Sequence, residues 1–145
     1  MIHIVLVEPE IPQNTGNIAR TCAATGCELH LVEPLGYKLE DKYLKRAGLD
    51  YWPLVKVHVH KDFAEVLERY PDAEFYYAST KAPRSYAQVA YPKDVFLVFG
   101  RESRGLPENL LERVYDRCIR IPMVEGARSL NLSNTVAVAV YEALR

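Results

Sequence analysis

The chain of 145 residues lacks the marks of a membrane, secreted or metal-binding protein. No apolar run approaches the roughly 18 residues of a membrane span, and we expect no signal peptide because no basic leader or small-residue cleavage site opens the chain. Its three cysteines, Cys22, Cys27 and Cys118, are an odd number without a C-x-x-C spacing. We therefore expect buried, reduced thiols in a cytoplasmic protein, and neither disulfides nor zinc ligands.

Several motifs of common enzyme classes are missing as well. No His-x-x-x-His or similar spacing occurs, so we expect structural or surface histidines and no metal. No G-x-x-x-x-G-K-[ST] loop is present, and the turn after the first expected strand holds only one glycine, Gly16. No serine or cysteine has the strand–elbow–helix setting of a hydrolase nucleophile. These absences exclude P-loop nucleotide cleavage, ordinary dinucleotide binding and hydrolase chemistry of that type.

Charge gives no overall indication of a nucleic-acid partner, because the net charge is −1. Lys42, Lys45 and Arg46 fall within one short segment, which is most simply interpreted as a solvated helix face. Other basic residues lie in or near expected loops: Arg20, Lys81, Arg84, Arg101, Arg104 and Arg128. Most of these loop arginines lie beside the candidate site described below.

Expected strands and helices alternate along the chain. Apolar, β-branched runs predict strands at Ile2–Val7, Leu29–Val32, Leu54–Val59, Phe75–Ala78, Val95–Phe99 and Cys118–Ile121. Helical patterns occur at Asn14–Thr25, after a cap at Asp62, at Leu106–Val114 and at Leu132–Leu144. Strands that are apolar on both sides predict a parallel sheet covered on both faces. With no linker or repeat, we expect one α/β domain over residues 1–145.

The last expected helix, Leu132–Leu144, is apolar on nearly all sides. Such a helix needs burial on both sides, which means a central position or a subunit interface. Asn131, Ser133 or Asn134 could each provide its N-cap.

Two polar loops follow strands in the last third of the chain: Gly100–Pro107 and Ile121–Asn134. Because ligands of open α/β sheets bind outside the carboxyl ends of the strands, we expect these loops to form two walls of one site. Gly100 and Gly105 would let a ligand approach the backbone closely. Three apolar side chains of the second loop offer a slot for a flat ring: Ile121, Met123 and Leu130.

Three segments together resemble the three motifs of the SPOUT class of RNA methyltransferases, in its ribose 2′-O-methylating branch: Asn14–Arg20, Phe96–Pro107 and Ile121–Asn134. The opening Val5–Arg20, with Arg46–Tyr51, is similar to the small tRNA wobble-nucleotide methyltransferases, and the resemblance covers nearly the whole chain. It implies a C-terminal deep trefoil knot, a homodimer and an S-adenosylmethionine-dependent enzyme without a metal. The substrate it implies is the ribose 2′-hydroxyl of cytidine or uridine 34, in the anticodon stem-loop of tRNA.

The resemblance also implies the residues of the site. The cofactor pocket would be lined by Ala78, Gly100, Ile121, Ser129 and Leu130. The reaction centre would be made by Asn14, Arg20, Glu102, Ser129 and Asn131. Arginine, with a pKa above roughly 12, is a poor base, so we expect Arg20 to stabilise negative charge. Glu102 would orient Arg20 or the third motif, and Asn14 and Asn131 would position the ribose.

Two other functions remain open at this point. One is a non-catalytic RNA- or nucleotide-binding module of the same fold, which would have no need of Arg20, Glu102, Ser129 and Asn131 together. The other is a 2′-O-methyltransferase of the same class that acts on ribosomal RNA.

Overall fold

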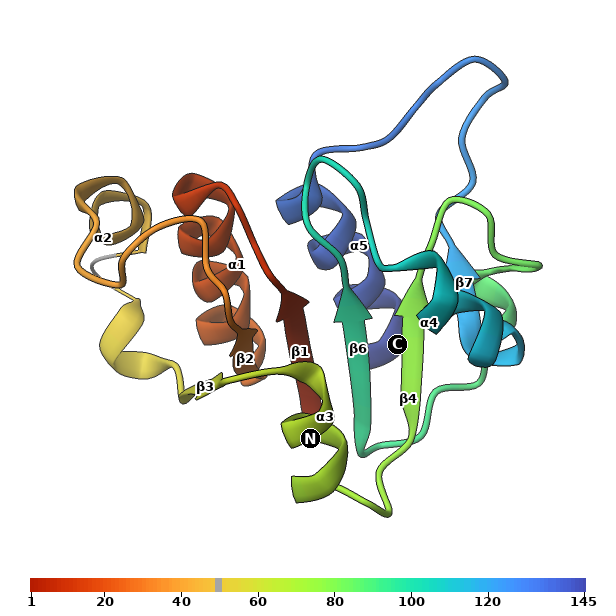
Figure 1. Ribbon diagram of the computed structural model, residues 1–145, viewed down its shortest axis with the longest axis horizontal. Helices are drawn as coiled ribbons and strands as arrows, with labels where there is room; N and C mark the ends of the chain where they lie inside the picture. Colours follow the sequence, from red (N-terminus) through yellow and green to blue (C-terminus); the bar gives the residue numbers. More distant parts are fainter. Residues whose placement is uncertain (49–50) are drawn as a thin grey trace.

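In the computed structural model, which describes residues 1–48 and 51–145, one sheet runs through the middle of the molecule (Figure 1). Its seven strands are all paired in parallel, in the order β3-β2-β1-β6-β4-β7-β5. The strands are β1 Ile2–Val7, β2 Glu28–Val32, β3 Val57–His60, β4 Phe75–Ala78, β5 Arg84–Ser85, β6 Val95–Phe99 and β7 Cys118–Arg120. The predicted parallel α/β sheet is therefore confirmed.

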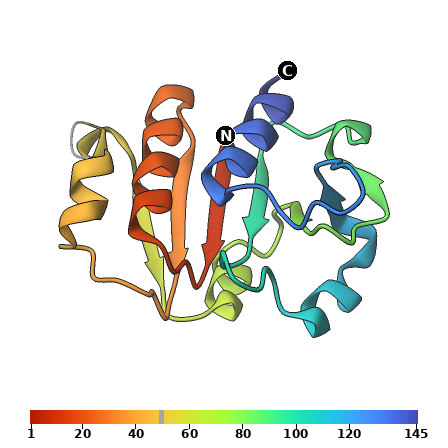
Figure 2. The same cartoon turned by 90° about the horizontal axis from the view of Figure 1, so that it is seen from above.

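Helices cover both faces of the sheet because successive strand side chains point to opposite sides. On β1, Ile4 and Leu6 join the apolar cluster under α1 (Pro12–Thr25) and α5 (Leu132–Leu144). Val5 and Val7 join the cluster on the other face. That second face is covered by α3 (Phe63–Arg69) and α4 (Glu108–Arg113), while α2 (Lys42–Gly48) packs beside α1 (Figure 2).

Most of the expected element boundaries are found in the structure. The others differ by one to three residues, and prolines explain the larger shifts. The strand expected at Leu54–Val59 begins only at Val57. Pro53 fixes its φ angle and lacks an amide donor, and it lies in a 3₁₀ turn, Trp52–Leu54. Pro107 stands at the N-cap of α4, which therefore begins after it and not at Leu106. Strand β5, only two residues long, was not predicted.

The predicted helix caps are confirmed. The carboxylate of Asp62 accepts the backbone amide of Glu65 at 2.9 Å, and Oδ1 of Asn131 accepts the amide of Asn134 at 3.3 Å. Both contacts satisfy a donor of the first helical turn. Asn131 therefore fixes the start of α5 directly beside the polar loop that precedes it.

Helix α5 is buried on one side only by the rest of the chain. Val136, Ala139 and Val140 are buried in the core, whereas Val138, Tyr141 and Leu144 have relative exposures of 39%, 58% and 48%. The chain alone thus leaves an apolar strip of this helix uncovered.

Cys22, Cys27 and Cys118 are buried and free, as predicted. Burial raises the pKa of all three thiols above the ordinary range. Among the described residues, none of the helices combines the length and the apolar character needed to span a bilayer.

Candidate active site

A cavity of about 820 Å³ lies where β4, β6 and β7 end. Its walls come from three segments that follow these strands: Ala78–Ala82, Gly100–Leu106 and the loop 121–131. The volume falls within the range of roughly 300 to 1,000 Å³ that is usual for small-molecule sites. The two polar loops are walls of one cavity, as the sequence predicted.

Eight of the nine predicted site residues line this cavity: Asn14, Ala78, Gly100, Glu102, Ile121, Ser129, Leu130 and Asn131. Arg20 is the exception. The positions therefore converge on one place, while the roles assigned to them remain predictions.

Gly100 has a structural role in addition to the expected one. A Cβ atom at Gly100 would overlap the backbone of Gly105 and Leu106. The loop turns back on itself here, and the amide of Gly105 donates to the carbonyl of Arg101 at 2.8 Å. Gly105 itself has a φ of +68°, in the left-handed region that glycine favours. Gly100 thus permits close packing of the loop against itself, while the expected close approach of a ligand to its backbone stays a prediction.

A row of hydrogen-bonded side chains joins the three motif segments. Ser133 Oγ donates to Asn131 Oδ1 at 2.5 Å, and Asn131 Nδ2 donates to Asn14 Oδ1 at 3.1 Å. Asn14 Nδ2 in turn donates to Glu102 Oε2 at 3.1 Å. The backbone amide of Asn134 fixes one end of this row and the carboxylate of Glu102 the other, so both amide groups have a defined orientation.

Glu102 holds the loop after β1 in place. Its carboxylate accepts the backbone amides of Glu10 at 2.8 Å and Ile11 at 3.0 Å, in addition to Asn14. The carboxylate of Glu10 accepts the amide of Ser103 at 2.9 Å and its hydroxyl at 2.7 Å. These Ser103 donors lower the pKa of Glu10, so it is ionised at neutral pH.

Of the two roles expected for Glu102, the contact to Arg20 is not the one observed. Glu102 reaches the third motif instead, through Asn14 and Asn131. Sequence reasoning missed Glu10 and Ser103. The available signal was their position: Glu10 follows β1, and Ser103 follows Glu102 in the loop after β6, at the sheet edge where sites form.

Arg20 lies on the exposed side of α1, away from the core side chains, as predicted. Its guanidinium carbon is 4.8 Å from the centroid of the Tyr51 ring, within cation–π range. Within residues 1–48 and 51–145 it forms no ion pair. Two residues of the Arg46–Tyr51 segment, Leu49 and Asp50, lie outside the described residues.

The loop 121–131 is hardly bonded to itself. In the described part of the chain it makes one internal backbone hydrogen bond, from Ala127 to Val124 at 3.2 Å. The carbonyl of Asn131 accepts the amide of Thr135 at 3.0 Å, and the remaining backbone groups of the loop have no backbone partner among the described residues, so they can bind a ligand. Together with the apolar side chains of Ile121, Met123 and Leu130, which line the cavity, they can hold a molecule with a flat ring and polar edges.

Positive charge borders the cavity. Arg101, Arg104 and Arg128 line it and form no ion pair with any described residue. Lys81, also at the cavity, pairs with Glu108 at 3.4 Å. Unpaired arginines at the entrance of a site suit an anionic ligand such as a nucleic-acid backbone.

The chain is similar in sequence to known RNA methyltransferases. The model of the SpoU rRNA methylase family matches residues 1–141. The chain is 48% identical to the tRNA (cytidine(34)-2′-O)-methyltransferase of Escherichia coli K12, over 100% of this chain and 93% of the relative.

Two solved structures extend the comparison. One, described as giving structural insights into the 2-OH methylation of C/U34 on tRNA, has a TM-score of 0.96 and 49% identity, covering 100% of this chain and 95% of that one. The other is an AdoMet-bound rRNA methyltransferase from Sinorhizobium meliloti, with a TM-score of 0.84 and 25% identity over 98% of this chain and 55% of that one.

Proposed function

The chain belongs to the SpoU rRNA methylase family, and we propose that it is a tRNA 2′-O-methyltransferase that modifies the ribose of cytidine or uridine 34. The knotted parallel α/β fold expected from the SPOUT resemblance is confirmed by this membership and by the all-parallel sheet. The relatives of about 50% identity support the tRNA assignment over ribosomal RNA, because they carry that activity in their names. We expect the enzyme to meet its tRNA in the cytoplasm.

The observation that carries the proposal is the hydrogen-bonded row from Ser133 through Asn131 and Asn14 to Glu102, at the edge of the cavity. It brings one residue of each motif segment into contact. A binding module has no need of such a preorganised polar row, whereas a transfer reaction needs the acceptor hydroxyl held in line with the group it attacks.

The cavity fits S-adenosylmethionine, the cofactor of this reaction. Its apolar part would hold the adenine ring between Ile121 and Leu130, and the free backbone groups of the loop 121–131 would hold the polar edges. When bound, the cofactor supplies an electrophilic methyl group on a sulfonium. No metal is required for this chemistry.

The residues of the chain then align the ribose and stabilise the negative charge that develops on its 2′-oxygen. Asn14 and Asn131 have fixed amide orientations, so they can hold the ribose hydroxyl in one position. Glu102 accepts three hydrogen bonds from the protein, and we assign it to positioning and not to proton removal. Arg20 stabilises the phosphate or the developing alkoxide as a cation, while the proton leaves through a neighbouring group or water.

We also propose that the enzyme works as a homodimer. The apolar strip of α5, made by Val138, Tyr141 and Leu144, is exposed in the single chain. A second copy is the partner we infer, because a two-fold contact places the same strip on both sides of an interface. Arg20 lies outside the cavity of its own chain, so it reaches the reaction only when RNA or a partner subunit bridges the distance.

Methyl transfer with radiolabelled S-adenosylmethionine tests the function. A tRNA transcript with cytidine or uridine 34 should be methylated, and the same tRNA with a 2′-deoxy nucleotide at position 34 should not. Equal labelling of both tRNAs would contradict the position. Labelling of ribosomal RNA alone would favour the second substrate class, and binding without labelling would favour a non-catalytic module.

A further inference from the structure

Four histidines form one continuous group with the carboxylates of Glu28 and Glu65. The group lies at β1, β2 and β3, away from the cavity. His3 lies on β1, His30 on β2, and His58 and His60 on β3. His3 is paired with Glu28 in the strand register, and His30 lies two residues after Glu28. Side chains two apart share a face, so the parallel register brings residues distant in sequence together.

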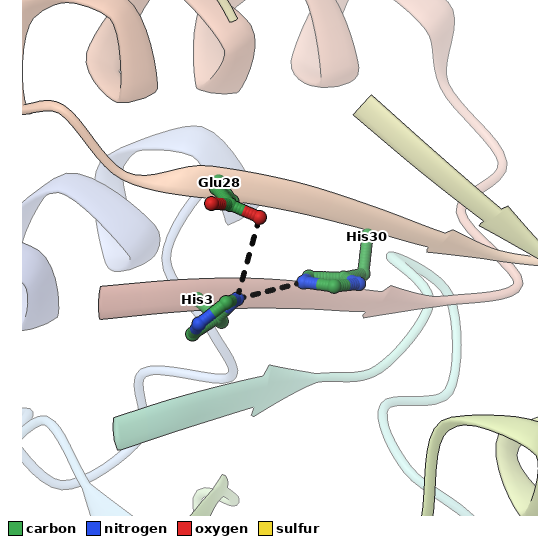
Figure 3. Close-up of side chains that lie close together, drawn as sticks. All are labelled: His3, Glu28 and His30. Carbon is green, nitrogen blue, oxygen red and sulfur yellow. Dashed lines mark hydrogen bonds and ion pairs between the residues drawn. The ribbon is translucent and has the colours of Figure 1, made fainter. Parts of the chain in front are cut away.

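Three of these side chains direct ligand atoms at one point: His3, Glu28 and His30 (Figure 3). His3 Nδ1 is 2.9 Å from His30 Nε2 and 3.9 Å from Glu28 Oε1. All three ligand atoms lie within 4.8 Å of one another. Ligands of a tetrahedral zinc ion, with bonds of about 2.0 to 2.1 Å, are separated by about 3.3 Å, so only small side-chain movements are needed.

The surroundings of His30 fix its lone pair toward that point. His30 Nδ1 is 2.9 Å from His60 Nε2, and His60 Nδ1 is 3.4 Å from Glu65 Oε1. His60 Nδ1 forms no hydrogen bond with any described residue, but a carboxylate this close favours a proton on it. We therefore assign the proton of His60 to Nδ1, and His30 then donates from its own Nδ1. The Nε2 of His30 is then unprotonated and accepts the proton of His3 Nδ1. When an ion binds, His3 has to carry this proton on Nε2 instead, which frees Nδ1 as a ligand.

The other two side chains are held by neighbours as well. His58 Nε2 donates to Glu28 Oε1 at 2.8 Å and orients that carboxylate. The His3 ring is stacked on Phe96, with centroids 4.1 Å apart and an interplanar angle of 2°. Metal sites commonly have such outer partners, which orient the ligands through hydrogen bonds.

We propose that His3, Glu28 and His30 form a binding site for a divalent zinc-type cation, with His58, His60 and Glu65 as the groups that position the ligands. Two imidazoles and one carboxylate are a donor set that zinc takes, with a water completing the coordination. The side chains of His3 and Glu28 are 14% and 20% exposed, so an ion can enter from solvent.

The site would hold β1 and β2 together near the amino-terminal ends of these strands, away from the cavity, and its role would be structural. It departs from the expectation of no metal, which rested on spacing within single segments. Here the ligands come from two strands, and Glu28 and His30 follow His3 by 25 and 27 residues in the sequence. Only the strand register brings them together.

Zinc binding to the chelator-treated, tag-free protein tests the proposal. Calorimetry should give one zinc per chain, and zinc should raise the midpoint of thermal unfolding. Cobalt, as a spectroscopic probe, should give visible bands of nitrogen and oxygen ligation without thiolate charge transfer. Glu28→Gln and His3→Asn should each weaken zinc binding at least tenfold, and so should His60→Gln through the positioning row.

Glu68→Gln is the matched control, because Glu68 is an exposed carboxylate of α3 outside the group. It should bind zinc as the wild type does. Glu28→Gln changes one charge with little change in shape, so it keeps the test open if His3→Asn fails to fold. The proposal is overturned if the wild type binds no zinc at micromolar concentration, or if Glu28→Gln binds it as well as the control.

Discussion

Glu10 and Glu102 hold each other's loops: the Glu102 carboxylate accepts the backbone amide of Glu10, and the Glu10 carboxylate accepts both donors of Ser103, the residue after Glu102. This reciprocal contact fixes the turn after β1 against the turn after β6. Asn14 depends on it, because its amide donates to the same Glu102 carboxylate.

Removal of this contact should lower turnover more than cofactor binding. We expect Glu102→Ala to reduce kcat about a hundredfold, since misplacement of a reacting group by about 1 Å has that effect, and Glu10→Ala to reduce it less. Steady-state kinetics with tRNA and calorimetry with cofactor measure the two effects. Glu40→Ala, at an exposed position away from the contact, is the control and should retain wild-type kinetics.

The contact has a defined pH dependence. The pKa of Glu10 is lowered from 4.5 by its hydrogen bonds to Ser103. A lowered carboxyl pKa stabilises the folded loop fully above the unfolded pKa and loses that effect as pH falls through the folded pKa. The ratio of wild-type to Glu10→Ala activity should therefore stay constant from neutral pH upward. A ratio that changes between pH 6 and 8 would contradict the assignment.

Gly100 and Gly105 offer a matched pair of substitutions. Gly100→Ala should disrupt the loop and abolish cofactor binding, because its Cβ would overlap the backbone of Gly105 and Leu106. Gly105→Ala meets no atom within 4 Å and should cost only the strain of its positive φ, about 1 to 2 kcal/mol. Calorimetric titration with S-adenosylmethionine measures both. Equal effects of the two variants would show that steric overlap at Gly100 is not what matters.

Arg20 lies outside the cavity, so its loss should spare cofactor binding. We expect Arg20→Ala to lower turnover roughly a hundred- to a thousandfold, the range for loss of one charge-stabilising donor. Arg20→Lys should recover part of the rate with an unchanged pH profile if the charge is what counts. A downward shift of its alkaline limb would instead indicate a base. Tyr51→Phe keeps the ring under the guanidinium and should be nearly neutral.

The dimer is tested at positions that the structure separates into exposed and buried. Tyr141→Glu and Val138→Glu place a charge on the exposed strip of α5 and should give a folded monomer by sedimentation. Val140 is fully buried in the chain's own core, so Val140→Glu should unfold the protein and is the control for general destabilisation. A wild-type chain that sediments as a folded monomer at micromolar concentration would rule out the dimer.

The sheet was predictable because its strands are apolar on both faces and each run is interrupted by polar turns. Leu54 was placed in a strand since its neighbours are apolar, but Pro53 turns the backbone there and Leu54 remains 73% exposed. Strand β5 has two residues, too few for any periodicity. These failures are local, and the predicted parallel sheet does not depend on them.

The site was predicted in outline and not in its contacts. Motif resemblance indicated Asn14, Glu102 and Asn131, whose side chains are hydrogen-bonded in a row. The resemblance could not show which groups donate hydrogen bonds to the Glu102 carboxylate, because these contacts depend on the conformation of the turn at Glu10. The histidine group was out of reach for a related reason: its members gather only when β1, β2 and β3 lie side by side in register.

The loop 121–131 has one internal backbone hydrogen bond, and this scarcity of internal bonds bears on the rate of catalysis. Fixing a backbone costs roughly 1 to 2 kcal/mol per residue. Since the loop has little hydrogen bonding of its own to offset this cost, we expect contacts with a bound cofactor to offset it. The spent cofactor retains the parts that contact the loop, and it leaves only when the loop loosens again. We expect this departure, and not the methyl transfer, to limit the steady-state rate. Amide hydrogen exchange across the loop should slow on cofactor binding, and a burst of methylated tRNA in the first turnover would be its kinetic signature.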